Sequence, residues 1–173
     1  MANEKYRIRL ARLEELPMLN AIEAAASTLF ENTKYASEVD QESLPLEILS
    51  EQQRKQLVWV AVDESDRPAG FALVLILDDR AHLHELSVAP SHGRQGIGTR
   101  LIDEVCAWAK GAGYSGVTLS TYLDIVWNAP FYRRLGFVEM KEEGLGEGLK
   151  NIRMKEAEAG LSITGRIIMI RPL

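Results

Sequence analysis

A glycine-rich turn at residues 91–101 is the feature that most limits how this chain can fold. It follows the apolar, strand-like run 81–88 and the break at Pro90, and it opens the run 97–112, whose apolar residues recur at helical spacing. A strand, a glycine turn and a helix together present backbone N–H groups and a helix N-terminus to phosphate. The turn carries Arg94 and Arg100 and no acid, although the net charge of the chain is −5. The sequence therefore predicts a polyanionic ligand here, and a surface turn without a ligand is the alternative.

Two well-known phosphate-binding motifs do not fit this turn. A Walker loop places Lys directly after its second glycine, but counting from Gly93 that position is held by Thr99. The dinucleotide fingerprint Gly-x-Gly-x-x-Gly starts at Gly96 and Gly98, but Leu101 stands where its third glycine belongs. Nucleoside triphosphates and dinucleotides are therefore disfavoured as ligands.

A third glycine motif matches better. The run Gln95-Gly96-Ile97-Gly98, after the strand 84–88 and Ala89-Pro90, resembles the acetyl-CoA loop of the GNAT superfamily of N-acyltransferases, which reads Gln/Arg-x-x-Gly-x-Gly/Ala. In that family the backbone amides of the loop and the following helix N-terminus hold the pyrophosphate of CoA. The Gln/Arg position is Gly93 here and the arginine comes one residue later, so the resemblance implies the backbone contacts but leaves a contact from the Arg94 side chain open. The loop residues that it implies for CoA binding are Gly93, Arg94, Gln95, Gly96, Ile97, Gly98 and Thr99.

A second segment, residues 127–137, adds to the first. Asn128 is a favourable helix N-cap, Pro130 fits a first helical turn, and Gly136 is a favourable helix end, so the pattern predicts a short helix over 129–135 and a strand from Phe137. The segment closely resembles the GNAT signature in which Asn precedes Phe-Tyr and Gly-Phe follows, and the resemblance covers roughly residues 57–140. It implies that Asn128 and Phe131 contribute to the CoA site and that Tyr132 gives a proton to the leaving thiolate. Without the resemblance, Phe131 and Phe137 would be core residues and Tyr132 a surface aromatic.

Acetyl transfer to an amine also requires a base. An amine like that of Lys has a pKa of about 10.4, so its neutral form costs about 4.6 kcal/mol near pH 7. Glu85, a charge in an otherwise apolar strand, is the candidate, and an outward-facing strand residue is its alternative reading. His82 and His84 alternate with it, and either could line a pocket as a base. The resemblance further implies that the fourth and fifth strands splay, so that the thioester end of CoA bonds to the backbone of Leu86, Ser87 and Val88.

The pattern along the chain predicts a mixed α/β fold. A strand at 6–10, helices at 13–30 and 45–56 with a loop at 31–43, and three antiparallel strands at 57–62, 70–77 and 81–88 come before the glycine turn. After the helix 97–112 come a parallel strand at 117–121, the short helix, a loop at 144–148, a helix at 149–161 and a strand at 166–170. We therefore expect one GNAT-type domain over residues 1–173, with a mostly antiparallel sheet of about seven strands and helices on both faces.

Composition narrows the function classes. The chain has 173 residues, of which 46% are hydrophobic and 26% charged, as in a globular protein. Its longest apolar run, 69–77, is too short to cross a membrane, and residues 1–5 lack the apolar core of a signal peptide. The single cysteine, Cys106, disfavours disulfides and is expected to be a small packed side chain, and with three histidines no metal site is expected. We expect a cytoplasmic protein without a membrane or nucleic-acid partner, and a possible homodimer through the strand 166–170.

The sequence therefore predicts an N-acetyltransferase that uses acetyl-CoA as co-substrate. The acceptor would be a primary amine, preferably of a small molecule, and the acetyl group would move directly in a ternary complex. A protein N-acetyltransferase and a non-catalytic CoA-binding module are the alternatives.

Overall fold

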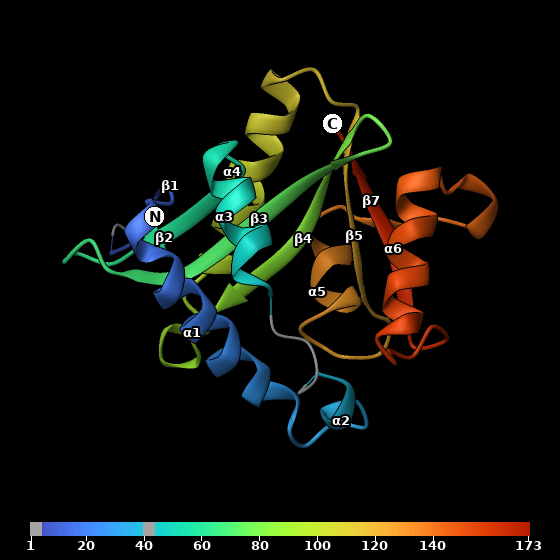
Figure 1. Ribbon diagram of the computed structural model, residues 1–173, viewed down its shortest axis with the longest axis horizontal. Coiled ribbons are helices and arrows are strands. Elements are labelled where there is room, and N and C mark those ends of the chain that lie inside the picture. Colours follow the sequence, from blue (N-terminus) through green and yellow to red (C-terminus); the bar gives the residue numbers. More distant parts are fainter. Residues whose placement is uncertain (1–4, 40–43) are drawn as a thin grey trace. The chain divides into compact units, whose positions relative to one another are not determined.

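Seven strands form one mixed sheet within residues 5–39 and 44–173, the part of the chain that the computed structural model describes (Figure 1). The strand order is β1-β2-β3-β4-β5-β7-β6. The pairs β1–β2, β2–β3, β5–β7 and β6–β7 are antiparallel, and β4–β5 is parallel, which confirms the predicted mixed sheet. The strands are β1 (Arg7–Leu10), β2 (Val58–Val62), β3 (Pro68–Leu77), β4 (Arg80–Val88), β5 (Gly116–Tyr122), β6 (Val138–Glu139) and β7 (Arg166–Pro172).

The helices follow the expected order, but several bounds differ. The helix expected over 13–30 is an α-helix at 16–27 with 3-10 turns at 13–15 and 28–30, and the one expected over 45–56 spans 46–54. The segment expected to be a loop over 31–43 contains the short helix α2 at 36–39, and residues 40–43 lie outside the described part. The predicted helix 129–135 ends one residue sooner, and the one predicted at 149–161 begins at Glu147 and ends at Glu158. The helices are α1 (Leu16–Ser27), α2 (Ala36–Val39), α3 (Leu46–Arg54), α4 (Ile97–Gly111), α5 (Ala129–Arg134) and α6 (Glu147–Glu158).

The chain divides into two compact units, each with its own buried residues. One comprises Met1–Val74 and Glu85–Val105, and the other Leu75–His84 and Cys106–Leu173. Strand β2 is buried along its whole length in the first, and Val117, Phe137 and Met169 are among the buried residues of the second. The predicted inner face of α4 is confirmed at Leu101, Val105 and Ala109, whereas Ala112 lies beyond the helix and is exposed. Cys106 is buried, as expected for a packed side chain.

Strand β7 has neighbours on both sides. Its residues 166–172 pair with β5, and Ile170 and Met169 also pair with Val138 and Glu139 of β6. The backbone N–H of Met140 donates to the carbonyl of Ile168 at 2.8 Å. Residues 169 and 170 of β7 are therefore paired on both sides within their own unit, and the homodimer through this strand stays a prediction.

The glycine-rich segment 144–148 opens α6 and binds an internal anion. The carboxylate of Asp78, in the turn between β3 and β4, accepts the N–H groups of Gly148 and Leu149 at 2.7 and 3.0 Å. A Cβ placed on Gly146 would lie 2.5 Å from the carboxylate carbon, so glycine is needed for this approach. The loop predicted over 144–148 therefore ends two residues sooner than expected, because Glu147 and Gly148 belong to α6.

We expect Asp78→Ala to lower the free energy of unfolding by about 1 kcal/mol more than Asp79→Ala, since loss of a helix cap costs about 0.5–2 kcal/mol. Asp78 and Asp79 have similar positive φ values, 52° and 55°, so an alanine is equally strained at either position. Asp79 is exposed, which makes it a suitable control. Urea unfolding of the two variants measures the difference. Equal losses would show that the carboxylate of Asp78 does not hold the start of α6.

Candidate active site

The glycine turn connects the end of β4 to α4 through a short 3-10 helix, Pro90–His92. Gly96 has φ of +77°, a left-handed conformation that glycine adopts without the steric cost of a Cβ. Helix α4 begins at the next residue, and its first-turn N–H groups have no partner inside the helix. The turn therefore offers backbone donors at the positive end of a 15-residue helix.

The exchange of Gly93 and Arg94 has a structural consequence. Gly93 has φ of −62°, a value that any residue can adopt, and it is Arg94 that has the positive φ, 58°. A Cβ on Gly93 would lie 3.2 Å from the carbonyl oxygen of Pro90, so the tight turn still favours glycine there. The Arg94 side chain is exposed.

Tyr6 ties the two ends of the turn to the start of β1, a role that the sequence analysis missed. Its hydroxyl is 2.7 Å from Nδ1 of His92, and its carbonyl oxygen accepts Nη1 of Arg100 at 2.7 Å. Tyr6 is 2% exposed. Arg100, counted with Arg94 as a basic residue of the turn, thus holds the framework of the turn in place. The Tyr6–His92 contact spans 86 residues, so no local pattern in the sequence indicates it. The one feature of the sequence that fits it is the polar hydroxyl of an aromatic residue near the start of the chain.

The end of β4 packs closely on β3 through Gly70. A Cβ on Gly70 would lie 2.9 Å from the carbonyl oxygen of Ser87 and 3.2 Å from side-chain atoms of Val88 and Ile97. Any other residue at this position would displace either the β4 backbone or the start of α4. The signal in the sequence is a glycine inside an apolar strand, which often marks a close backbone approach.

Glu85, the candidate base, has a local hydrogen-bond partner. The Ser87 hydroxyl donates to Oε1 of Glu85 at 2.6 Å. Ser87 is buried, while Leu86 and Val88 are half-buried. Together with the glycine turn, Gly70 and Tyr6, these residues form one group of candidate site residues in the first unit.

A second group lies in the other unit, around α5. Asn128 occupies the N-cap position as expected, but its side chain makes no capping hydrogen bond to the helix, and its Oδ1 instead accepts the Thr121 hydroxyl at 2.9 Å. The Tyr132 ring packs edge-on against Phe131 and Phe137, with ring centroids 5.3 and 5.7 Å apart. Phe137 is buried, as its core assignment predicts, and Phe131 is half-buried.

The two strand histidines of β4 differ in their surroundings. His82 is 1% exposed, and its Nδ1 is 2.9 Å from the Thr118 hydroxyl. Burial, with a smaller contribution from His84, lowers the pKa of His82 to about 3, so the ring is neutral and serves as a packed core residue. His84 is half-buried, and burial lowers its pKa as well.

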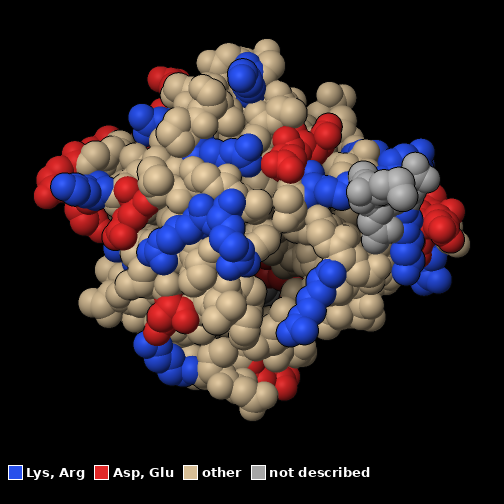
Figure 2. Space-filling view, turned by 180° about the vertical axis from the view of Figure 1, so that it is seen from behind, with Lys and Arg blue, Asp and Glu red and all other residues tan. Residues whose placement is uncertain are grey.

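Charge on the surface is mixed. Figure 2 shows Lys and Arg side chains spread over the face turned away from the viewer in Figure 1, with acidic side chains between them. The net charge of −5 therefore does not make this face uniformly acidic. No described helix is long and apolar enough to cross a membrane.

Comparison with known families identifies a match over much of the chain. The model of the family described as "Acetyltransferase (GNAT) family" matches residues 19–137, which is more than half of the 173 residues. The match includes β4, the glycine turn, α4 and the whole of α5.

Solved structures share the fold. A PaiA N-acetyltransferase from Thermoplasma acidophilum in complex with coenzyme A is 18% identical, with a TM-score of 0.71 over 97% of this chain and 99% of that chain. The ribosomal-protein-S18-alanine N-acetyltransferase from Escherichia coli is 19% identical, with a TM-score of 0.67 over 96% and 93%. A GNAT family acetyltransferase from Brucella melitensis in complex with acetyl-CoA is 26% identical, with a TM-score of 0.56 over 77% and 82%.

Proposed function

The chain belongs to the acetyltransferase (GNAT) family, and on this basis we propose that it transfers the acetyl group of acetyl-CoA directly to a primary amine of a small molecule. The observation that carries the proposal is the glycine turn, whose left-handed Gly96 leads into the N-terminus of α4. Backbone N–H groups at such a terminus favour a polyanion. Two similar structures contain coenzyme A or acetyl-CoA, which supports the same ligand for this chain.

In this proposal the two ends of acetyl-CoA use different parts of the chain. The pyrophosphate accepts N–H groups from the turn, residues 93–99, and is attracted by the helix dipole. The thioester end bonds to the backbone of β4 at Leu86, Ser87 and Val88. Tyr6 and Arg100 hold the turn in place through their hydrogen bonds, and the absence of a side chain at Gly70 lets β3 pack closely on the end of β4.

The chemistry requires one base and one acid. The amine loses a proton to a base on β4, for which the sequence offers Glu85 and, as alternatives, His82 and His84, and the amine nitrogen then attacks the thioester carbon. The carbon–nitrogen bond forms, the carbon–sulfur bond breaks, and the thiolate receives a proton from the hydroxyl of Tyr132. The nitrogen loses its second proton as the amide forms, and this proton restores the Tyr132 hydroxyl. Asn128 and Phe131, which flank Tyr132 in α5, are expected to contribute to the CoA site.

The acceptor is best identified with an assay for free CoA thiol. We expect at least one amine from a panel of putrescine, Nα-acetyl-lysine, tyramine and a dipeptide to raise thiol release at least tenfold over hydrolysis of acetyl-CoA alone. Release only with a folded protein or a long peptide would favour a protein N-acetyltransferase, the kind of substrate that the Escherichia coli structure is named for. Calorimetric binding of acetyl-CoA with no transfer to any amine would favour a CoA-binding module.

A further inference from the structure

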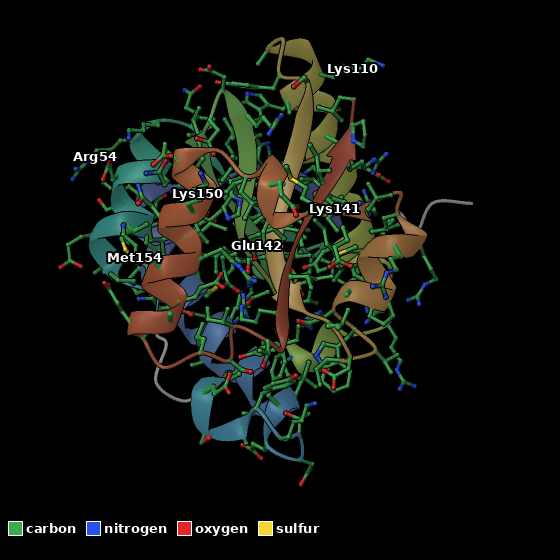
Figure 3. The ribbon with its side chains drawn as sticks, turned by 90° about the vertical axis from the view of Figure 1, so that its right-hand side faces the viewer. Arg54, Lys110, Lys141, Glu142, Lys150 and Met154 are labelled. Carbon is green, nitrogen blue, oxygen red and sulfur yellow. The ribbon has the colours of Figure 1, made fainter. Side chains whose placement is uncertain are left out.

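A partly buried ion pair joins α6 to the start of β7, among residues that the proposed chemistry does not use. Figure 3 shows Lys150 and Met154 on α6, and both are exposed, whereas Glu156 of the same helix is only 8% exposed. Oε2 of Glu156 accepts Nε of Arg166 at 3.2 Å, and Nη2 of Arg166 donates to the carbonyl oxygen of Ser120 at 3.2 Å. Because burying an ion pair is costly unless it is hydrogen-bonded, these contacts hold the carboxylate in one place.

The paired residues of β4 and β5 lie close in sequence to Ser120, the residue that Arg166 contacts. The pairs are Ala81 with Val117 and His82 with Thr118. The next residues on the same faces of the two strands are His84 and Ser120, and Oγ of Ser120 is buried without a hydrogen-bond partner in the structure. The polar side chains that follow the two paired positions on these faces are therefore His84 and Ser120.

Burial along β4 separates the two candidate bases. Side chains alternate across a strand, so His84 shares a face with Leu86 and Val88, and all three are half-buried. Glu85 lies on the opposite face between Leu83 and Ser87, which are both buried, and its carboxylate already accepts the Ser87 hydroxyl. The more open face of β4 is therefore the one that carries His84.

We propose that His84 is the general base that takes a proton from the acceptor amine, and that Glu156, fixed by Arg166, is the positioning residue that stabilises the resulting imidazolium. The inference rests on the proposed function and deepens it. A ring nitrogen of His84 accepts a proton from the ammonium group of the acceptor. The neutral amine nitrogen of the acceptor then attacks the thioester carbon. In the whole reaction the thiol gains one proton and one proton is released to solvent through His84.

The charges around His84 suit this role. Burial lowers the pKa of His84 most, Glu156 raises it, and Lys155 and Arg166 lower it, while His82 beside it on β4 is neutral. The net shift is downward, so the ring is neutral at pH 7 and able to accept a proton. Activity should therefore fall as the pH drops through the pKa of His84. Loss of the Glu156 charge removes the contribution that raises this pKa, so the fall should move to lower pH.

The test compares His84→Gln and Glu85→Gln with the amine that is most active in the thiol assay. We expect His84→Gln to lower kcat at pH 7 about 100-fold, the lower end of the range for general-base catalysis. In this variant the fall in kcat at low pH, the acid limb of the pH profile, should disappear. The loss of kcat relative to the wild type should shrink towards pH 10, where the amine loses its proton without a base. Glu85→Gln tests the competing base, and we expect it to lower kcat less than His84→Gln does and to leave the fall in activity at acid pH in place.

A second pair of variants separates catalysis from packing. Glu156→Gln can still accept Arg166, and its acid limb should move to lower pH, whereas Glu158→Gln, an exposed residue of the same helix, should leave the profile unchanged. Thermal unfolding and calorimetry with acetyl-CoA verify that each variant is folded. A His84→Gln enzyme with an intact acid limb, or an unshifted profile in Glu156→Gln, overturns the assignment, as does a large loss confined to Glu85→Gln. A wild-type chain that acetylates no amine overturns the proposed function itself.

Discussion

Replacing Tyr132 with Phe should lower kcat for acetyl transfer by about 10² to 10⁴, the usual contribution of a positioned acid. The Tyr132 ring packs edge-on against Phe131 and Phe137, and Phe keeps both of these ring contacts. The substitution therefore removes the hydroxyl proton and little packing. Because the pyrophosphate is held by the glycine turn in our proposal, the Kd for acetyl-CoA should change by less than about twofold.

Steady-state thiol release at saturating amine measures kcat, and calorimetry measures the affinity for acetyl-CoA. Tyr114→Phe is a matched control, since Tyr114 is also half-buried beside an aromatic ring, with its centroid 5.7 Å from that of Trp108. It should keep full activity. An unchanged kcat in Tyr132→Phe would remove the acid role, and a large loss of acetyl-CoA affinity would show that the hydroxyl binds the ligand instead.

Local patterns were enough to predict most elements of this fold. Pro130 and Gly136 bracket α5 because their effects on the backbone act within one or two residues. The apolar runs of β2 and β3 predicted buried strands because a buried strand needs no more than a few consecutive apolar residues. The glycine turn was found for the same reason, since a strand, a turn and a helix in succession are visible within twenty residues.

Contacts between distant segments could not be predicted in this way. Asp78 and Gly148 are 70 residues apart, so the start of α6 and its internal anion appear only once the chain is folded. Asn128 is a residue type that often caps helices, but in the structure its Oδ1 accepts a hydrogen bond from the Thr121 hydroxyl in place of a helix N–H. The choice between Glu85 and His84 also depended on burial and on the partner of Glu85, neither of which alternation along a strand reveals.

The largest expected effect on ligand binding is that of Gly96→Glu, which should weaken acetyl-CoA binding at least 100-fold. No atom lies within 4 Å of the position where a Cβ would be built on Gly96, so the side chain would not clash with the protein. The Glu side chain would instead project from the turn that is proposed to hold the pyrophosphate. Its carboxylate would then lie beside the negatively charged pyrophosphate and repel it. The loss of one or two charge-assisted hydrogen bonds, at about 1.5–3 kcal/mol each, is enough for such a change.

Gly113→Glu is the control for backbone strain, because Gly113 also has a positive φ, 86°, and open space at its Cβ position, but lies beyond the C-terminus of α4. Both variants should lose about 1–2 kcal/mol of folding free energy, the cost of a side chain in the left-handed region. By calorimetry, acetyl-CoA binding should be lost in Gly96→Glu and kept in Gly113→Glu, and Gly96→Ala, which has the strain without the charge, should fall between the two. Equal binding by Gly96→Glu and Gly113→Glu would show that the turn is not the pyrophosphate site, and the helix dipole of α4 would then have no ligand to attract.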